Sequence, residues 1–346
     1  MFRIVGIGGG TGLPVLLRGL ATQPGVSVSA IVTVSDNGGS SGRLRDGFGM
    51  PAVGDLRNCL VALSDPESTL GSLFQHRFTS EGGMAGSELE GHALGNLIVA
   101  ALYQKTGSLI QAIELAGQIM PQRGHAMAAT EMPTTLCASF RDGAVVRGEC
   151  QIAAARGEIE RVWLEPQSPP ASRGVLDAIR TADAVVLAPG SLYTSIVPNL
   201  LVDGIADAIC KSAAVKIMVC NLMTQPGETE NYTASDHLRV LESYLGARAI
   251  QVMIVAADKR RARSRRYAAA GVDFVRFDRE EILARGIVPV EAGVAERHDG
   301  RIRHDADSLG KTIVNLLQAR TASVFSGAQA KANEDSRSLI PLHACV

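Results

Sequence analysis

The chain has 346 residues, enough for one large or two ordinary domains with a substantial buried core. Hydrophobic residues make up 46% and charged residues 20%, and the net charge of −1 gives no electrostatic reason to expect nucleic-acid binding. No run approaches the roughly 18 apolar residues of a membrane span, and the apolar stretch at the N-terminus is too short for a signal peptide. We therefore expect a cytoplasmic protein.

The cysteines and glycines narrow the class of protein further. None of the six cysteines belongs to a Cys-x-x-Cys pair, so neither a zinc site nor a disulfide framework has support, and we expect reduced thiols. The 36 glycines and the low aromatic content of 4% favour tight turns and close backbone contacts over aromatic stacking platforms.

Short apolar runs alternate with amphipathic stretches along the chain, a pattern typical of βαβ units around a parallel sheet. Strands are predicted at residues 3–7, 27–34, 184–188, 215–219, 249–255 and 272–275. Helices are predicted at residues 13–20, 56–63, 93–103, 109–119, 174–180, 233–245 and 307–318. The fold class is therefore α/β, a Rossmann-like and mostly parallel sheet with helices on both faces.

One segment departs from this alternation. Residues 136–140, 144–149 and 159–164 look like strands, and Asp142-Gly143 is a hairpin turn signal. We expect a small antiparallel insertion at about residues 134–164 of a single domain that spans residues 1–320. From residue 321 small polar residues replace the periodic pattern, so we expect a disordered tail at residues 321–346.

A glycine loop follows the first strand and precedes a helix. In such a loop the backbone N–H groups can approach an anion closely, and the helix contributes its positive end. The spacing is not a clean Gly-x-Gly-x-x-Gly, and no lysine follows, so it is not a Walker A loop. A tight turn with no ligand is the alternative. The candidate ligand-binding residues here are Gly8, Gly9, Gly10, Thr11 and Gly12.

The second strand ends in another unusual loop. Asp36 lies where dinucleotide sites hold a ribose, and it is also the one candidate for Mg²⁺. The glycines, hydroxyls and arginines that follow can surround a phosphate or diphosphate with donors. A flexible surface loop is the plainer interpretation. The candidates are Asp36, Asn37, Gly38, Gly39, Ser40 and Ser41.

Two helix starts carry further polar residues. Asp55 can cap a helix, and Arg57 and Asn58 in its first turn are candidates to face the sheet edge. His92 and Asn96 are four residues apart on one helix face and need partners, either a ligand or a buried network. If the protein is an enzyme, His92 and Asp55 are the catalytic candidates; no catalytic residue is assigned beyond them.

Two later strand ends add donors of the same kind. Because ligands of open α/β sheets bind outside the carboxyl ends of strands, we expect these loops to form one site with the earlier ones. The candidates are Gly190, Ser191, Tyr193 and Thr194 after one strand and Asn221 and Thr224 after the next.

A basic run with six positive charges occupies residues 259–266. Such runs are usually solvated helix faces, and no aromatic residues are interleaved for base stacking. Tyr267 at its end can stack on a ring or donate to a sugar, and Arg303 can meet a diphosphate from the far side of the cleft.

With these motifs assembled, the sequence closely resembles the YvcK branch of the YvcK/CofD family. The matching stretches are GGGTGLPVLLRGL (8–20), VTVSDNGGSSGRLR (32–45), GDLRN (54–58), FQHRF (74–78), GHALGNL (91–97), PGSLYTSIVPNLL (189–201), CNLMTQPGETENYTASDH (220–237) and RHD (303–305). They cover the chain from residue 2 to about 318.

The resemblance implies a cytoplasmic protein that binds UDP-N-acetylglucosamine or a related UDP-sugar. It implies a regulatory role in cell shape and peptidoglycan metabolism during gluconeogenic growth, and members are commonly named gluconeogenesis factors. Tyr267 and Arg303 match positions that hold the sugar nucleotide in YvcK-type proteins. Cell-wall synthesis proteins are candidate partners, oligomers are allowed, and no cofactor is required.

The CofD branch implies a different activity, the Mg²⁺-dependent transfer of a 2-phospholactate group from a nucleotide-activated donor. The family often has two adjacent aspartates after the second strand, and here they are Asp36 and Asn37. Because Mg²⁺ prefers carboxylate oxygens, Asn37 weakens the transferase interpretation. Ala306 stands where some relatives have threonine, so phosphorylation there does not carry over. We expect a ligand-binding regulator.

Overall fold

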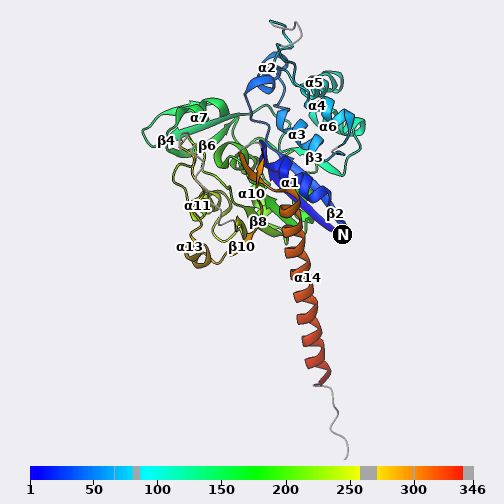
Figure 1. The fold of residues 1–346 in the computed structure, drawn as a ribbon, viewed down its shortest axis with the longest axis vertical. Coiled ribbons are helices and arrows are strands. Elements are labelled where there is room, and N and C mark those ends of the chain that lie inside the picture. Colours follow the sequence, from blue (N-terminus) through cyan, green and yellow to red (C-terminus); the bar gives the residue numbers. More distant parts are fainter. Residues whose placement is uncertain (66, 81–85, 258–270, 299–300, 338–346) are drawn as a thin grey trace, which may run out of the picture.

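The structure, a computed structural model, describes residues 1–65, 67–80, 86–257, 271–298 and 301–337. Most of them form one layered α/β body, and a long C-terminal helix projects from it (Figure 1). Within the described residues, none of the helices combines the length and apolar character that a membrane span requires. The five cysteines in this part of the chain are free.

A seven-stranded parallel sheet forms the centre of the body, in the order β10-β9-β8-β7-β1-β2-β3. Its strands are β1 (Phe2–Gly8), β2 (Val26–Val32), β3 (Gly124–Ala128), β7 (Ala184–Leu187), β8 (Val215–Val219), β9 (Val252–Ala256) and β10 (Val288–Ala292). The apolar strands β7 and β8 are buried throughout, as expected for a sheet covered on both faces. The predicted parallel sheet is therefore confirmed.

Helices cover both faces, and side chains that alternate along each strand divide the core in two. Ile4 of β1 packs with the helices of one face, and Val5 and Ile7 pack with those of the other. The first face carries α1 (Gly12–Ala21), α3 (Gly54–Ala62), α5 (Leu94–Thr106), α6 (Leu109–Ile119) and the start of α14 (Ala306–Arg337). The second carries α8 (Val175–Thr181), α9 (Val197–Leu200), α10 (Ile205–Lys211) and α11 (Ala234–Leu245).

The remaining elements are short. The described helices also include α2 (Gly39–Phe48), α4 (Thr69–Gln75), α7 (Glu149–Ala155), α13 (Arg279–Ala284) and a π-helical turn, η1 (Leu192–Ile196). The antiparallel sheet β5-β4-β6 consists of β4 (Thr135–Phe140), β5 (Val145–Arg147) and β6 (Ile159–Glu165). It is the predicted insertion, interrupted by α7. A second antiparallel pair, β11 (Ala295–His298) and β12 (Arg301–His304), leads into α14.

Three details of the sheet differ from the prediction. The expected strand at 272–275 is wrong: this segment forms one isolated bridge, between Phe274 and Met223, and Val275 packs into the core beside the sheet. The edge strands β3 and β10 were not predicted. They are partly exposed and lack a long apolar run, and Pro289 is tolerated in β10 because an edge strand leaves one side unpaired.

The last helix is anchored by a close backbone crossing. A Cβ on Gly19 of α1 would overlap the carbonyl oxygen of Ala306, and one on Gly310 of α14 would overlap that of Gly19, so the two helices touch along their backbones. Beyond this contact α14 continues as helix to Arg337 and away from the body (Figure 1). Residues 321–337, the first part of the segment for which we expected disorder, are therefore helical in the structure. For residues 338–346, outside the described residues, that expectation stays a prediction.

Candidate functional site

The loops after β1, β2, β7 and β8 meet at one edge of the sheet. Thr33 N–H donates to Gly8 O at 3.0 Å, and Asn199 Nδ2 donates to the same carbonyl at 3.1 Å. The Asn221 side chain bridges to the next loop, accepting from Gly190 N–H at 2.9 Å and donating to Gly190 O at 2.7 Å. The strand ends that we expected to converge lie together.

The glycine loop is held tightly by its own surroundings. The carboxylate of Asp55 accepts a hydrogen bond from Gly10 N–H at 2.7 Å. A Cβ on Gly9 would come within 2.7 Å of the same carboxylate, and one on Gly12 would overlap the carbonyl oxygen of Pro189. Gly10 has a φ of +59°, which favours glycine. Packing therefore requires these glycines whether or not a ligand binds, and Asp55 occupies the N–H group that an anion would use.

The loop after β2 is also bonded internally. Asp36 Oδ1 accepts from Gly38 N–H at 2.7 Å, which makes an Asx turn ahead of α2. Asn37 Nδ2 donates to Gln151 Oε1 at 2.7 Å, and Asn37 Oδ1 accepts from Cys150 N–H at 3.0 Å. The amide of Asn37 thus ties this loop to α7 of the insertion, a role that a carboxylate could not fill on the donor side.

Four carboxyl groups gather around these loops. Burial raises the pKa of Asp55 to about 6, and burial together with the charges of Asp36, Asp55 and Glu228 raises that of Glu149 to about 9. Burial likewise raises the pKa of Glu228, which accepts from Thr194 Oγ1 at 2.8 Å. Among the described residues, no group of three or more histidine, cysteine, aspartate or glutamate side chains is placed to hold a metal ion.

His92 and Asn96 form a buried network with Ser40. Ser40 Oγ accepts from Asn96 Nδ2 at 3.0 Å and from Ala93 N–H at 3.4 Å, which leaves its hydrogen for His92 Nδ1 at 3.0 Å. Burial, then the charges of Arg43 and Arg77, lowers the pKa of His92, so the ring is neutral at pH 7. Ser40 and Asn96 are 3% and 2% exposed, and the network satisfies the Ser40 hydroxyl and the Asn96 amide nitrogen but leaves the buried Asn96 Oδ1 without a hydrogen-bond partner among the described residues.

Arg57 is buried in the same region. Its Nη1 donates to Phe74 O at 3.2 Å and to Gln75 Oε1 at 2.8 Å, and its Nη2 donates to Asn58 Oδ1 at 2.7 Å. Burial lowers the pKa of Arg57 to about 10. Arg57 therefore positions Asn58 and Gln75, which line the cleft described below, rather than facing it itself.

Of the candidates after β7 and β8, some lie at the cleft and others are buried in the fold. Gly190 and Asn221 line the cleft described below, and Ser191 Oγ accepts from Gln225 Nε2, another lining residue, at 2.8 Å. Tyr193 instead packs in the core, with its hydroxyl 3.0 Å from that of Tyr232.

Thr224, the last of these candidates, pairs with the backbone of Asp273 rather than with the rim. Tyr267 lies outside the described residues.

An open cleft of about 600 Å³ runs along this rim. Predicted residues that line it are Thr11, Gly12, Asn58, Gly190, Asn221 and Arg303, and residues not predicted include Arg18, Gln75, Gln225 and Arg301. Arg18 follows Thr11 by seven residues and Val15 by three on α1, the spacing of a single helix face. This spacing was the signal in the sequence that could have identified Arg18.

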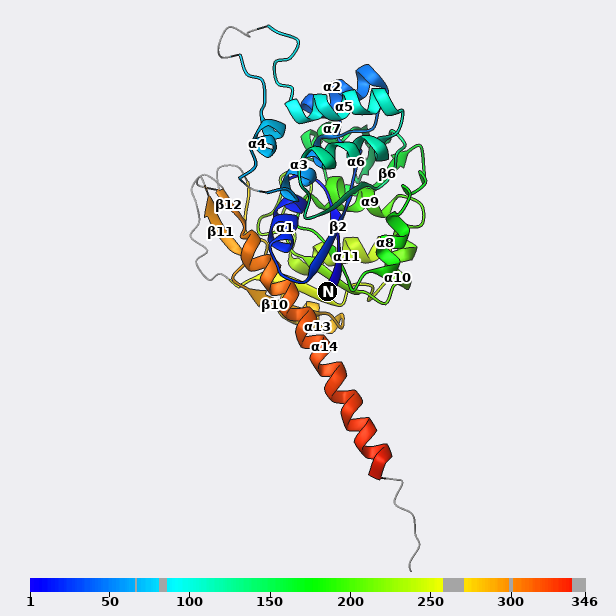
Figure 2. The ribbon, with the colours of Figure 1, turned by 90° about the vertical axis from the view of Figure 1, so that its right-hand side faces the viewer.

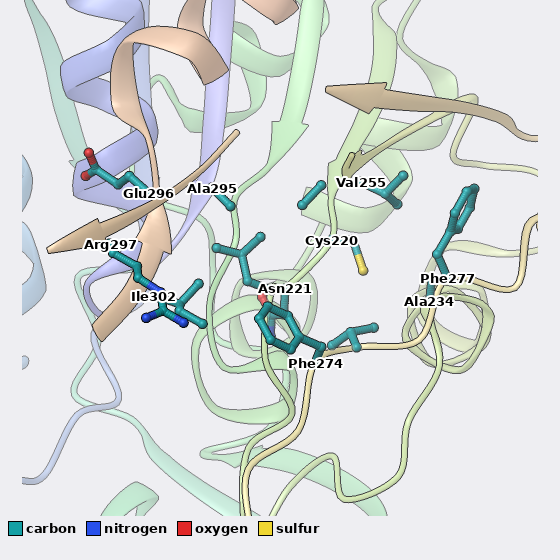
Figure 3. A pocket seen from close by; sticks show the side chains of 13 residues that line it. Cys220, Asn221, Ala234, Val255, Phe274, Phe277, Ala295, Glu296, Arg297 and Ile302 are labelled. Carbon is teal, nitrogen blue, oxygen red and sulfur yellow. The ribbon is translucent and has the colours of Figure 1, made fainter. Parts of the chain in front are cut away.

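A second cavity of about 390 Å³ adjoins the cleft and shares Asn221, Leu222 and Ile302 with it. Its walls are mainly apolar. Figure 3 shows Phe274 beside Asn221 at the cleft side, and Phe277 on the far side. An open cleft with polar and charged residues therefore lies beside a mainly apolar cavity.

Comparisons with known proteins agree along nearly the whole chain. The family model described as "2-phospho-L-lactate transferase CofD" matches residues 4–295. The chain is 42% identical over 317 residues to the "Gluconeogenesis factor" of Bacillus subtilis, covering 91% of this chain and 98% of that protein. It is 42% identical over 326 residues to the "Gluconeogenesis factor" of Halalkalibacterium halodurans, covering 93% and 98%.

The fold comparison gives the same result. A crystal structure of a Bacillus halodurans protein superposes with a TM-score of 0.85 at 42% identity, covering 90% of this chain and 99% of that one. A family model that matches most of the chain and relatives this similar over their full length establish the assignment that the motifs suggested. The chain belongs to the YvcK/CofD family.

Proposed function

We propose that the protein binds a UDP-sugar, UDP-N-acetylglucosamine being the first candidate, and acts as a ligand-sensing regulator of cell shape and cell-wall metabolism during gluconeogenic growth. The observation that carries the proposal is the 600 Å³ cleft, which has arginines on one wall and an apolar chamber beside it. A sugar nucleotide has the matching chemistry, an anionic diphosphate between two ring systems. The relatives named gluconeogenesis factors support the metabolic setting.

Regulation without turnover is supported by how the polar groups are used. Ser40 and His92, a serine–histidine pair at the site, are buried and bonded to each other. Burial raises the pKa values of the Asp55 and Glu149 carboxyl groups, and the charge of Asp36 raises both further. As partners for such a regulator we propose cell-wall synthesis proteins, and as its compartment the cytoplasm.

The second candidate is a transferase that moves a 2-phospholactate-type group from a nucleotide-activated donor. The matching family model favours it, as does Asp55, whose pKa of about 6 suits a general base near neutral pH. Asn37, bonded through its amide to Gln151, stands where a second carboxylate would be needed for Mg²⁺.

One experiment separates the two. Purified protein is titrated with UDP-N-acetylglucosamine by calorimetry, and the ligand is recovered and analysed after incubation with Mg²⁺. Saturable binding with unchanged ligand supports the regulator. A new product supports the transferase, and absence of binding refutes the proposal.

A further inference from the structure

A groove of about 490 Å³ runs along β3, the edge strand of the seven-stranded sheet. All of β3 lines it, together with α6 and the turn at Ser172 and Arg173. α6 packs on β3 (Figure 1), and it lies on the other side of the body from the β11–β12 hairpin, which borders the cleft (Figure 2). The groove and the cleft share no lining residue, so they are separate places on the molecule.

The free edge of β3 presents backbone groups to this groove. Ala129 N–H donates to Val32 O at 2.8 Å, and backbone groups alternate in direction along a strand. The N–H and C=O groups of Gly124 and Ala126 therefore point away from β2, and no other residue in the described ranges bonds to them. Such an edge pairs readily with another extended chain unless lysine, proline or a covering element blocks it. β3, with the sequence Gly-His-Ala-Met-Ala, contains neither lysine nor proline.

Apolar side chains flank this edge from both faces of the sheet. Leu60, Ile110 and Ile113 line the groove on the face that carries α3 and α6, and Met127 belongs to the core of the other face. Ile110 and Met127 are partly exposed. Burying these surfaces favours a ligand with apolar side chains.

One exposed charge of each sign also borders the groove. Glu114 lies on α6 and Arg173 lies in the turn, and neither forms an ion pair with another residue that the structure describes. Ser172 N–H donates to Ala129 O at 2.9 Å, which holds Arg173 at the carboxyl end of β3. An anionic group of a ligand is therefore attracted to that end of the strand.

The two charges are offset along the strand. Ser108 Oγ donates to Glu131 Oε2 at 3.1 Å, so α6 begins at the carboxyl end of β3 and runs back along it. At 1.5 Å per residue, Glu114 lies about 7.5 Å along α6 from Leu109. Three extended residues span about 10 Å, so the two ends of a tripeptide match this spacing.

We propose that the groove binds a short apolar peptide, which adds to β3 as an eighth, parallel strand. Its carboxylate meets Arg173, its ammonium group meets Glu114, and its side chains cover the apolar surfaces on either side of the edge. Main-chain hydrogen bonds to a sheet edge supply affinity in this mode of recognition, and the flanking pockets supply specificity. The proposal goes beyond the nucleotide-binding function and does not depend on it.

The test is calorimetric titration of the full chain with the tripeptide Leu-Leu-Leu, with its N-acetylated and C-amidated forms, and with octanoate. Leu-Leu-Leu should bind saturably, with a dissociation constant of about 1 mM or tighter. Each capped form should bind about two- to fivefold more weakly, because one exposed ion pair is lost. Octanoate has an apolar chain and a carboxylate but no peptide groups, and it should bind at least about tenfold more weakly than Leu-Leu-Leu.

Three variants assign the contacts. Arg173→Ala should weaken Leu-Leu-Leu about two- to fivefold and leave the amidated form unaffected, whereas Glu114→Gln should do the same for the N-acetylated form. Ala126→Pro removes the N–H that faces the groove and keeps the N–H groups that bond to β2, since proline is tolerated on the free side of an edge strand. It should weaken Leu-Leu-Leu at least about tenfold.

Lys105→Ala and Glu280→Gln are the matched controls, because both residues are exposed and lie outside the groove. Their affinities should equal those of the wild type, and thermal unfolding should show which variants are folded. If Ala126→Pro does not fold, the comparison of capped and uncapped peptides decides. The proposal is overturned if Leu-Leu-Leu does not bind saturably or if octanoate binds as tightly. It is equally overturned if Arg173→Ala and Glu114→Gln weaken the capped and uncapped peptides alike.

Discussion

The two sides of the cleft use their polar groups in opposite ways. On the side of the glycine loop, Gly10, Asp36, Asp55 and Thr194 are bonded to one another or to neighbouring loops. On the side of the hairpin, Arg18 and Arg303 have no ion-pair partner among the described residues. Groups that are already bonded support the fold, whereas charges without an ion pair remain able to bind an anion. Substitutions on the first side should therefore change stability, and those on the second should change binding.

The largest effect is expected for Gly12→Val. Its Cβ would overlap the carbonyl oxygen of Pro189, a backbone atom that cannot move without displacing the loop after β7. We expect a loss of at least about 3 kcal/mol of unfolding free energy, or no folded protein, measured by urea denaturation.

Gly47→Ala is the control for this substitution, because a Cβ there meets nothing within 4 Å. It should leave stability unchanged or slightly raised. A Gly12→Val protein as stable as Gly47→Ala would contradict the packing role of the loop.

A smaller loss is expected for Ser40→Ala. The change removes the hydroxyl shared by His92, Asn96 and Ala93 N–H, and it leaves buried polar groups without a partner. We expect a cost of about 1–3 kcal/mol in denaturant unfolding, with pyrophosphate affinity unchanged. Ser41→Ala, next to it and without a side-chain hydrogen bond in the described part of the chain, should cost less. Equal costs for the two variants would show that the network contributes nothing.

The raised pKa of Glu149, on the side of the glycine loop, predicts that stability depends on pH. Glu149 has a pKa of about 9 in the folded protein against an ordinary value of 4.5, so the unfolded chain loses this proton first. Stability should therefore fall as pH rises from about 4.5 towards 9. Glu149→Gln removes this term, and its stability relative to the wild type should grow with pH. The effect is moderated because Glu149 is partly exposed and solvent screens it.

Denaturation at three pH values between about 5 and 9 measures this difference. Glu114→Gln on the exposed face of α6 is the control and should follow the wild type at every pH. Parallel curves for wild type and Glu149→Gln would show that Glu149 titrates normally.

The sequence predicted the glycine-loop side of the cleft better than the side that carries Arg18 and Arg303, and the reason is physical. The parallel sheet, the antiparallel insertion and the loops after β1 and β2 follow from local patterns of apolar runs and glycines. Arg18 and Arg303 are 285 positions apart, and only the packing of α14 on α1 brings them together.

The local sequence pattern also did not predict the direction in which individual side chains point. Tyr193 lies in the π-helical turn η1, whose wider winding turns it into the core while Thr194 reaches Glu228. Asp55, predicted as a helix cap, instead accepts from Gly10, 45 residues earlier.

The smallest effect on stability is expected for Arg301→Ala, on the hairpin side of the cleft. Arg301 is exposed at the cleft and forms no ion pair in the described residues, so unfolding free energy should change by no more than about 0.5 kcal/mol. Its charge should still attract anions, and pyrophosphate affinity should fall about two- to threefold at low salt. At roughly 0.5 M salt the difference should vanish, because exposed charges are screened over a few ångströms. Calorimetry at the two salt concentrations measures both. A stability loss above about 1 kcal/mol would mean that Arg301 is paired within the fold, and the contrast between the two sides of the cleft would no longer hold.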